Sequence, residues 1–183
     1  MYGLKIDENC YFSKYPPNNL PDEDIQADMY LKAIEILIKN NFSHYEISNF
    51  AKNNFFSKHN LNYWNNKNYY GFGAGAHGYE NEIRYYNTAN LKNYILSPCK
   101  HEYSKKLTTQ EQLEEEIFLG FRKIEGINVK DIDKKFNINF NKKYEKTLNK
   151  YVSQKYLTET NVGYKLSGKG ILVSNVILSE FLD

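Results

Sequence analysis

The segment from His59 to Trp64 holds the side chains with the clearest capacity for ligand chemistry. It reads His-Asn-Leu-Asn-Tyr-Trp and contains the only tryptophan in the chain. An imidazole can bind a metal ion, and aromatic rings can stack on a flat macrocycle. These residue types predict a site for a planar, metal-containing ligand. The competing interpretation is a loop histidine that is exposed or hydrogen-bonded to the backbone, with Trp64 packed in the core.

A glycine-rich segment follows this motif. Gly71, Gly73 and Gly75 alternate along the chain and precede His77. In a strand, alternate residues share one face, so the glycines predict a face without side chains. Either a helix packs tightly there or a cofactor approaches the backbone. The spacing differs from the dinucleotide-binding fingerprint, because the Gly-x-x-Gly that opens a helix is absent.

The composition excludes several classes of protein. The 183 residues carry a net charge of +2, with lysine and glutamate interspersed, so no nucleic-acid-binding footprint appears. Two distant cysteines, Cys10 and Cys99, do not form a disulfide framework. No apolar run has the length of a transmembrane helix, and no secretory segment follows Met1. We therefore expect a cytoplasmic protein, with peripheral membrane contact left open.

The first half of the chain predicts an α/β arrangement. Asp22, Glu23 and Asp24 suit the positive end of a helix dipole, and an apolar stripe continues to about residue 37. A strand, helix and strand in this order predict a parallel unit at the edge of a barrel-like sheet. The other expected elements are strands at 2–6, 43–48 and 83–86, an irregular loop at 53–68, a strand and turn at 71–78, and a helix at 88–96 begun by a Thr88 cap.

The second half predicts a mostly helical domain. Pro98 and mixed polar residues at 97–106 suggest a boundary, and Thr108-x-x-Glu111 is a capping box that opens a helix to about residue 124. We expect one domain over 1–97 and a second over 107–183. The remaining expected elements of the second domain are helices at 129–136, 140–154 and 170–182 and a hairpin at 157–166.

Six motifs stand in the order expected of one family. They are Tyr2–Ile6, Leu20–Asp24, His44–Lys52, the tryptophan and glycine motifs, Glu114–Arg122, and Leu166–Asn175. Together they resemble the C-terminal half of the radical-SAM proteins related to oxygen-independent coproporphyrinogen III oxidase, most closely the haem chaperone branch, HemW. The resemblance implies a truncated barrel-like sheet followed by a winged-helix-like domain.

The resemblance also assigns ligands. His59 is expected to bind haem iron, Asn60 to orient it, and Tyr63 and Trp64 to line the porphyrin. The resemblance places S-adenosylmethionine beside the backbone of Phe50 and Ala51, and places S-adenosylmethionine or substrate near Gly73, Gly75 and His77. His77 replaces an apolar residue of the oxidase branch, which weakens the case for a second S-adenosylmethionine.

One cofactor of the family has no matching ligands in this sequence. The family holds a [4Fe–4S] cluster on three clustered cysteines, whereas Cys10 and Cys99 are isolated. We therefore expect the distal part of a haem chaperone that works with an N-terminal radical-SAM half and delivers haem to apo-haemoproteins. The alternative is the oxidase itself, which decarboxylates coproporphyrinogen III through a radical. A third, less favoured hypothesis is a winged helix that binds nucleic acid.

Overall fold

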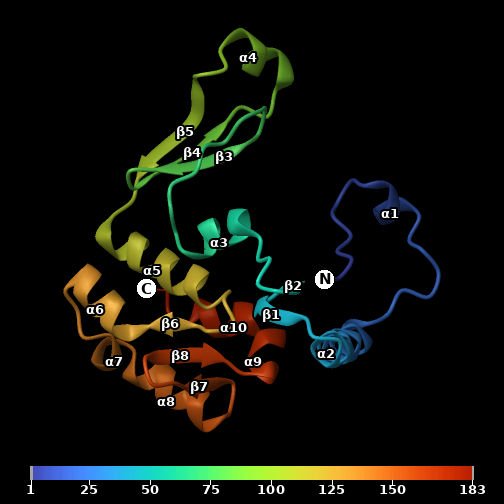
Figure 1. Cartoon of the computed structure of the whole chain (residues 1–183). Coiled ribbons are helices and arrows are strands. Elements are labelled where there is room, and N and C mark those ends of the chain that lie inside the picture. Colours follow the sequence, from blue (N-terminus) through green and yellow to red (C-terminus); the bar gives the residue numbers. More distant parts are fainter. Residues whose placement is uncertain (1, 183) are drawn as a thin grey trace. The chain divides into compact units, whose positions relative to one another are not determined.

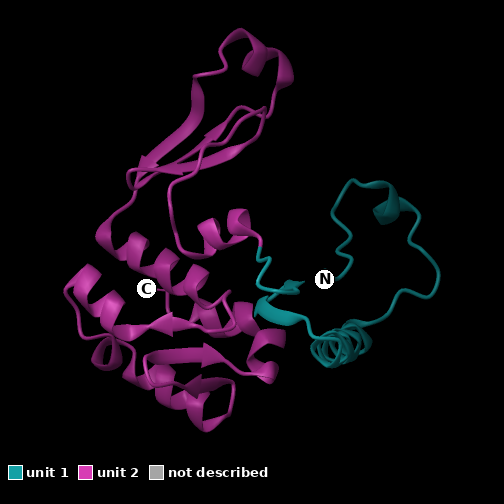
Figure 2. Cartoon of the chain, in the orientation of Figure 1, with its two compact units in different colours: residues 1–56 teal, residues 57–183 magenta. Residues whose placement is uncertain are grey.

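The structure is a computed structural model that describes residues 2–182, in which the chain divides into two compact units between Phe56 and Ser57 (Figure 2). Each unit is described by itself.

The first unit contains one long helix and one short hairpin. Helix α1 (Tyr11–Lys14) precedes α2 (Glu23–Lys39), and β1 (Ser43–Glu46) pairs antiparallel with β2 (Asn49–Ala51). The Asp22 side chain caps α2 by accepting a hydrogen bond from the Ile25 amide at 2.8 Å. The predicted helix is therefore confirmed at its predicted start.

Two predictions for this unit are wrong. Residues 2–6 are irregular rather than a strand, and the strands on either side of the loop at residues 47 and 48 are antiparallel neighbours. A strand that follows a helix was expected to pair in parallel with an earlier strand. Here β1 turns back at once on β2, so the local hairpin replaces the expected crossover. No closed barrel forms among residues 2–182.

The second unit begins with a short helix and a three-stranded sheet. Helix α3 (Lys58–Trp64) is followed by β3 (His77–Glu80), β4 (Ile83–Asn87), α4 (Leu91–Leu96) and β5 (His101–Lys106). The strands are antiparallel in the order β3-β4-β5, and Figure 1 shows α4 in the connection between β4 and β5. The predicted strand at 83–86 is confirmed as part of β4.

Several sequence predictions in this region are wrong in detail. Residues 58–64 are helical although the asparagine-rich composition suggested a loop throughout 53–68. The glycine segment 71–76 is not a strand, so its glycines do not share a strand face. Asn90 rather than Thr88 caps α4, and residues 101–106 form a strand paired with β4. Polar strands such as β5, which is exposed along its length, give no hydrophobic alternation to detect.

The C-terminal part matches the sequence prediction more closely. Helix α5 (Thr109–Gly120) starts with the predicted Thr108–Glu111 capping box. A sheet of order β6-β8-β7 lies among helices around a core that includes Phe121, Phe140 and Phe181. The other elements are β6 (Ile127–Asn128), α6 (Val129–Phe136), α7 (Phe140–Lys143), α8 (Glu145–Ser153), β7 (Leu157–Glu159), β8 (Gly163–Leu166), α9 (Gly168–Leu172) and α10 (Ser174–Ser179).

The fold is therefore mixed α/β, with three small antiparallel sheets in the described part of the chain. Over residues 2–182, no helix combines the length and apolar character that a membrane-spanning segment needs. The predicted domain boundary near residues 97–107 remains a prediction.

Candidate functional site

Helix α3 carries all four residues predicted to contact haem. The Ser57 hydroxyl accepts a hydrogen bond from the Asn60 amide at 3.3 Å and so begins the helix. His59 and Tyr63 are four residues apart and share a helix face, with ring centroids 4.8 Å apart in an edge-on arrangement. His59 is exposed, whereas Tyr63 is half-buried. The imidazole is therefore open to solvent beside an aromatic ring that is fixed by packing.

Tyr63 connects this helix to the sheet. Its ring lies 4.4 Å from the ring of Tyr69, and the Tyr69 backbone exchanges two hydrogen bonds with Tyr79 of β3. The Tyr69 hydroxyl accepts a hydrogen bond from Arg84 Nη1 at 2.8 Å. Burial raises the pKa of Tyr69, and the nearby positive charge of Arg84 acts in the opposite direction.

Arg84 joins the sheet to α5. Its Nε donates to Glu115 Oε1 at 2.9 Å, and its Nη2 donates to Glu115 Oε2 at 2.7 Å. The guanidinium also lies over the Tyr79 ring, 4.2 Å from its centroid. One side chain of β4 thus positions Tyr69, and through Tyr69 the helix that carries His59.

Trp64 lies on the side of α3 that meets α5. The Arg122 guanidinium is 6.0 Å from the Trp64 ring and 5.0 Å from the Phe118 ring. Lys123 Nζ donates to Asn65 Oδ1 at 3.0 Å just beyond the helix end. The Trp64 Nε1 atom is buried and has no hydrogen-bond acceptor among the described residues. The structure therefore gives Trp64 a packing contact with the C-terminal helices.

The glycine segment is shaped by hydrogen bonds from the sheet. Gly73 and Gly75 have φ values of +110° and +71°, which favour glycine. The buried Asn87 amide donates to the carbonyls of Gly71 and Gly73, both at 3.0 Å, and Asn87 Oδ1 lies 2.9 Å from His101 Nδ1. A side chain on Gly71 would meet the His77 carbonyl. The close approach at Gly71 is thus between backbone segments of the same chain.

Three of the organising residues were absent from the sequence prediction. Arg84, Asn87 and Glu115 stand in segments whose composition resembles ordinary strand and helix surface. Their roles arise from hydrogen bonds between residues that are 15 to 31 positions apart in the sequence. A pattern of neighbouring residues does not reveal such contacts. His101 also takes part in this arrangement through its contact with Asn87 Oδ1.

Phe50 and Ala51 belong to β2 of the first unit. Phe50 stacks on His44 with centroids 4.3 Å apart, and Ala51 is buried. Glu46 is also buried; its carboxylate accepts hydrogen bonds from the Ser48 amide, at 2.8 Å, and from the Asn49 side chain. This turn is a preformed polar loop next to an aromatic stack.

Burial controls the titration of two side chains near this turn. Burial, helped by the negative charge of Glu46, raises the pKa of Tyr30 to about 12. Burial also lowers the pKa of His44, against the opposing effect of a hydrogen bond to the Ile47 carbonyl. Burial therefore favours the neutral form of both groups.

The donor set does not fit an iron–sulfur cluster. Cys10 and Cys99 lie in different units, and residues 2–182 contain no group of three His, Cys, Asp or Glu side chains arranged to hold a metal ion. The thiolates that such a cluster requires are therefore not supplied by the described residues. A single imidazole such as His59 can still ligate iron that is already held in a porphyrin.

Comparisons with known proteins give one domain family and several similar proteins. Residues 107–173 match the family model of the HemN C-terminal domain. The whole chain is 37% identical to a protein of Lactococcus lactis named "Heme chaperone HemW" and 34% identical to one of that name from Bacillus subtilis, covering 49% and 50% of those proteins. The chain thus spans about half the length of the curated relatives it matches.

A solved structure shares the fold. It is titled "Coproporphyrinogen III oxidase (HemN) from Escherichia coli is a Radical SAM enzyme" and aligns with 89% of this chain and 42% of its own, with a TM-score of 0.69 and 13% identity. At this identity the likeness concerns the fold alone. Over its whole length the chain is thus similar to about half of the proteins named HemW, and residues 107–173 match the HemN C-terminal domain.

Proposed function

We propose that this chain binds haem through His59 and contributes to the delivery of haem to apo-haemoproteins. Haem is the cargo, and His59 supplies an axial nitrogen to its iron. The half-buried Asn60 orients the helix or the imidazole, and Tyr63 contacts the porphyrin from the same helix face. Trp64 was predicted to line the porphyrin; we propose instead that it anchors α3 to α5.

One observation carries this proposal. His59 is an exposed imidazole on a helix whose neighbouring side chains are held from two directions, by Tyr69 beside Tyr63 and by Arg122 beside Trp64. A ligand that binds an exposed imidazole binds more tightly when the imidazole is already held in place. If the histidine stood on a free loop, ordering that loop would cost free energy and reduce the affinity. The family relation supports haem as that ligand.

A haem titration followed by absorbance tests the proposal. Wild-type chain should give a shifted Soret band at one haem per chain, and His59→Ala should weaken binding about tenfold or more, as expected from losing an iron–nitrogen bond. His101→Gln is the matched control, because His101 is also exposed but stacks on Tyr85. Equal binding by wild type and His59→Ala would exclude His59 as the ligand.

S-adenosylmethionine binding is a further part of the proposal. The proposed contact in the intact protein is the backbone of Phe50 and Ala51. Separately, the segment with Gly73, Gly75 and His77 is proposed to lie near S-adenosylmethionine or the substrate. The [4Fe–4S] cluster of the family needs cysteines that the N-terminal radical-SAM half would provide. The intact His-Asn-x-x-Tyr-Trp motif at residues 59–64 and the similarity to the HemW proteins favour the chaperone over the oxidase.

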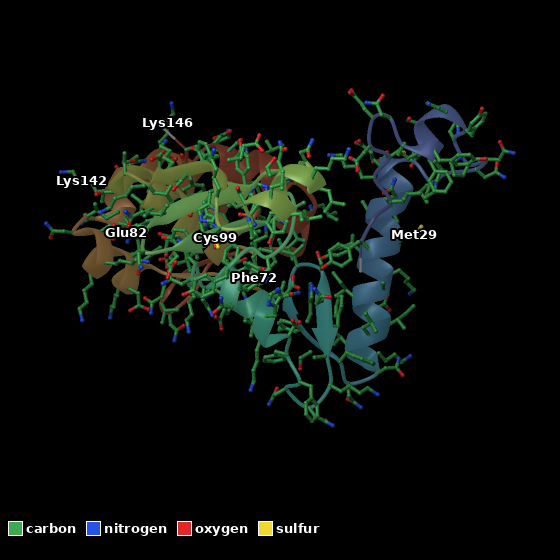
Figure 3. The ribbon with its side chains drawn as sticks, turned by 90° about the horizontal axis from the view of Figure 1, so that it is seen from above. Met29, Phe72, Glu82, Cys99, Lys142 and Lys146 are labelled. Carbon is green, nitrogen blue, oxygen red and sulfur yellow. The ribbon has the colours of Figure 1, made fainter. Side chains whose placement is uncertain are left out.

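The C-terminal domain is proposed to act as a winged-helix-like partner surface. Helices α5, α6 and α8 and the hairpin β7–β8 follow the order of such a module. Lys142 and Lys146 of α7 and α8 point outward in Figure 3 and are candidate cations for a nucleic-acid contact. In the same helices Lys143 donates to the uncharged Gln110, and the charge of Lys150 is paired with that of Glu180. We therefore propose no nucleic-acid partner. We also propose a cytoplasmic location.

A further inference from the structure

Three aromatic side chains stand side by side on the sheet of the second unit. His77 of β3 pairs with Tyr86 of β4, and Tyr86 pairs with Tyr103 of β5. Neighbouring ring centroids are 5.3 and 5.1 Å apart, and the two tyrosine rings are nearly parallel. We call His77, Tyr86 and Tyr103 the aromatic row.

The aromatic row lies on the sheet face that meets α3. Tyr79 and Arg84 are two residues from His77 and Tyr86, so they share that face. Arg84 on this face binds the Tyr69 hydroxyl, and Tyr69 packs on Tyr63 of α3. The opposite face carries Tyr85, whose ring occupies the place where a side chain on Gly78 would be.

The two halves of this face differ in exposure. Tyr79 is only 6% exposed and is covered by Arg84. In the aromatic row, by contrast, Tyr103 is 42% exposed, His77 is exposed and Tyr86 is half-buried. The row begins one pair of residues, about 7 Å, along the strands from Tyr79. An open aromatic surface therefore continues directly from the covered one.

The charges around the row select the kind of ligand. The two cations of this face, Arg84 and Lys105, are paired with Glu115 and Glu111. The face therefore offers rings without free positive charge, which suits an apolar planar ring better than a polyanion.

We propose that the aromatic row is the surface against which the porphyrin ring rests while His59 binds the iron, an inference that rests on the proposed function. A series of aromatic contacts joins the two: His59 to Tyr63 at 4.8 Å and Tyr63 to Tyr69 at 4.4 Å. Tyr69 pairs with Tyr79, and His77 of the row lies two residues from Tyr79 on the same face of the sheet. The row contacts the macrocycle and not the iron, so its contribution is independent of the metal.

Iron-free protoporphyrin IX tests this independence. Its binding to the full chain, followed by porphyrin fluorescence, should weaken about 2- to 12-fold in Tyr103→Val and in Tyr86→Val, the range of one aromatic contact. Tyr103→Phe and Tyr86→Phe should bind as wild type, because the ring remains. His59→Ala should also bind this porphyrin as wild type. Valine favours strands, and circular dichroism checks that the sheet is retained.

Tyr70→Val is the control on the other side of the sheet. The Tyr70 hydroxyl donates to Glu80, whose side chain alternates with that of Tyr79, so this tyrosine lies away from the row. The inference is overturned if Tyr70→Val weakens binding as much as Tyr103→Val, if both row variants bind as wild type, or if the wild type does not bind the iron-free porphyrin. Loss of haem binding in wild type would instead contradict the proposed function.

Discussion

At the scale of single residues, Trp64 has a packing contact with Arg122, and its predicted contact with the porphyrin stays a prediction. Trp64 was predicted to line the porphyrin, and its contact with Arg122 could not be inferred because Arg122 lies more than fifty positions away in the sequence. His59 and Tyr63, by contrast, were placed on one motif by their spacing alone. Residue types predict which side chains can bind a ligand, but their orientation depends on distant partners.

The role of Trp64 leads to a stability prediction. Trp64→Ala should lower the free energy of unfolding of the second unit by about 2–4 kcal/mol, near the lower end of values for a large buried side chain, because Trp64 is only partly buried. Trp64→Phe should recover about half of that loss. Urea unfolding followed by circular dichroism measures both. A loss below about 0.5 kcal/mol in Trp64→Ala would contradict the anchoring role.

At the scale of elements, helices were predicted better than strands. The helices α2 and α5 have side-chain caps at Asp22 and Thr108 that the sequence shows directly. Strand β5 is fully exposed, so it lacks the alternation by which a strand is detected. The antiparallel pairing of β1 and β2 was not predicted. A strand after a helix has the same residue pattern whether it pairs in parallel with an earlier strand or turns back in a hairpin.

The bond between β4 and α5 gives a prediction at this scale. Arg84→Ala should lower the free energy of unfolding by about 1–3 kcal/mol, because it leaves the partly buried Glu115 without its bidentate partner. Lys106→Ala is the control: its pair with Glu82 is exposed and should contribute less than about 0.5 kcal/mol. Denaturant unfolding of both variants compares them. Equal losses would show that Arg84 is not the main link.

At the scale of the whole molecule, the two units differ in how much they bury. In the first unit, α2 buries no residue completely, and Met29, labelled in Figure 3, is 59% exposed. In the second unit, Phe121, Phe140 and Phe181 are almost fully buried. This difference was not predictable from composition, because α2 has the apolar stripe of an ordinary packed helix.

The difference in burial predicts a difference in local stability. Amide hydrogens of α2 should exchange with solvent at least about tenfold faster than those of α5 and α8, because few buried apolar contacts oppose local opening. Hydrogen exchange followed by mass spectrometry of peptides from the chain measures this. Protection of α2 equal to that of α8 would contradict the expectation.

Helix α3 has only seven residues, fewer than an isolated helix needs to persist in water. Its helical form therefore depends on contacts such as that of Trp64 with Arg122, just beyond α5, that is, on a folded C-terminal domain. A cargo that binds only the helical form would stabilise that domain in proportion to its affinity. Binding of the cargo to α3 and folding of the C-terminal domain are then thermodynamically linked, although that domain does not contact the cargo.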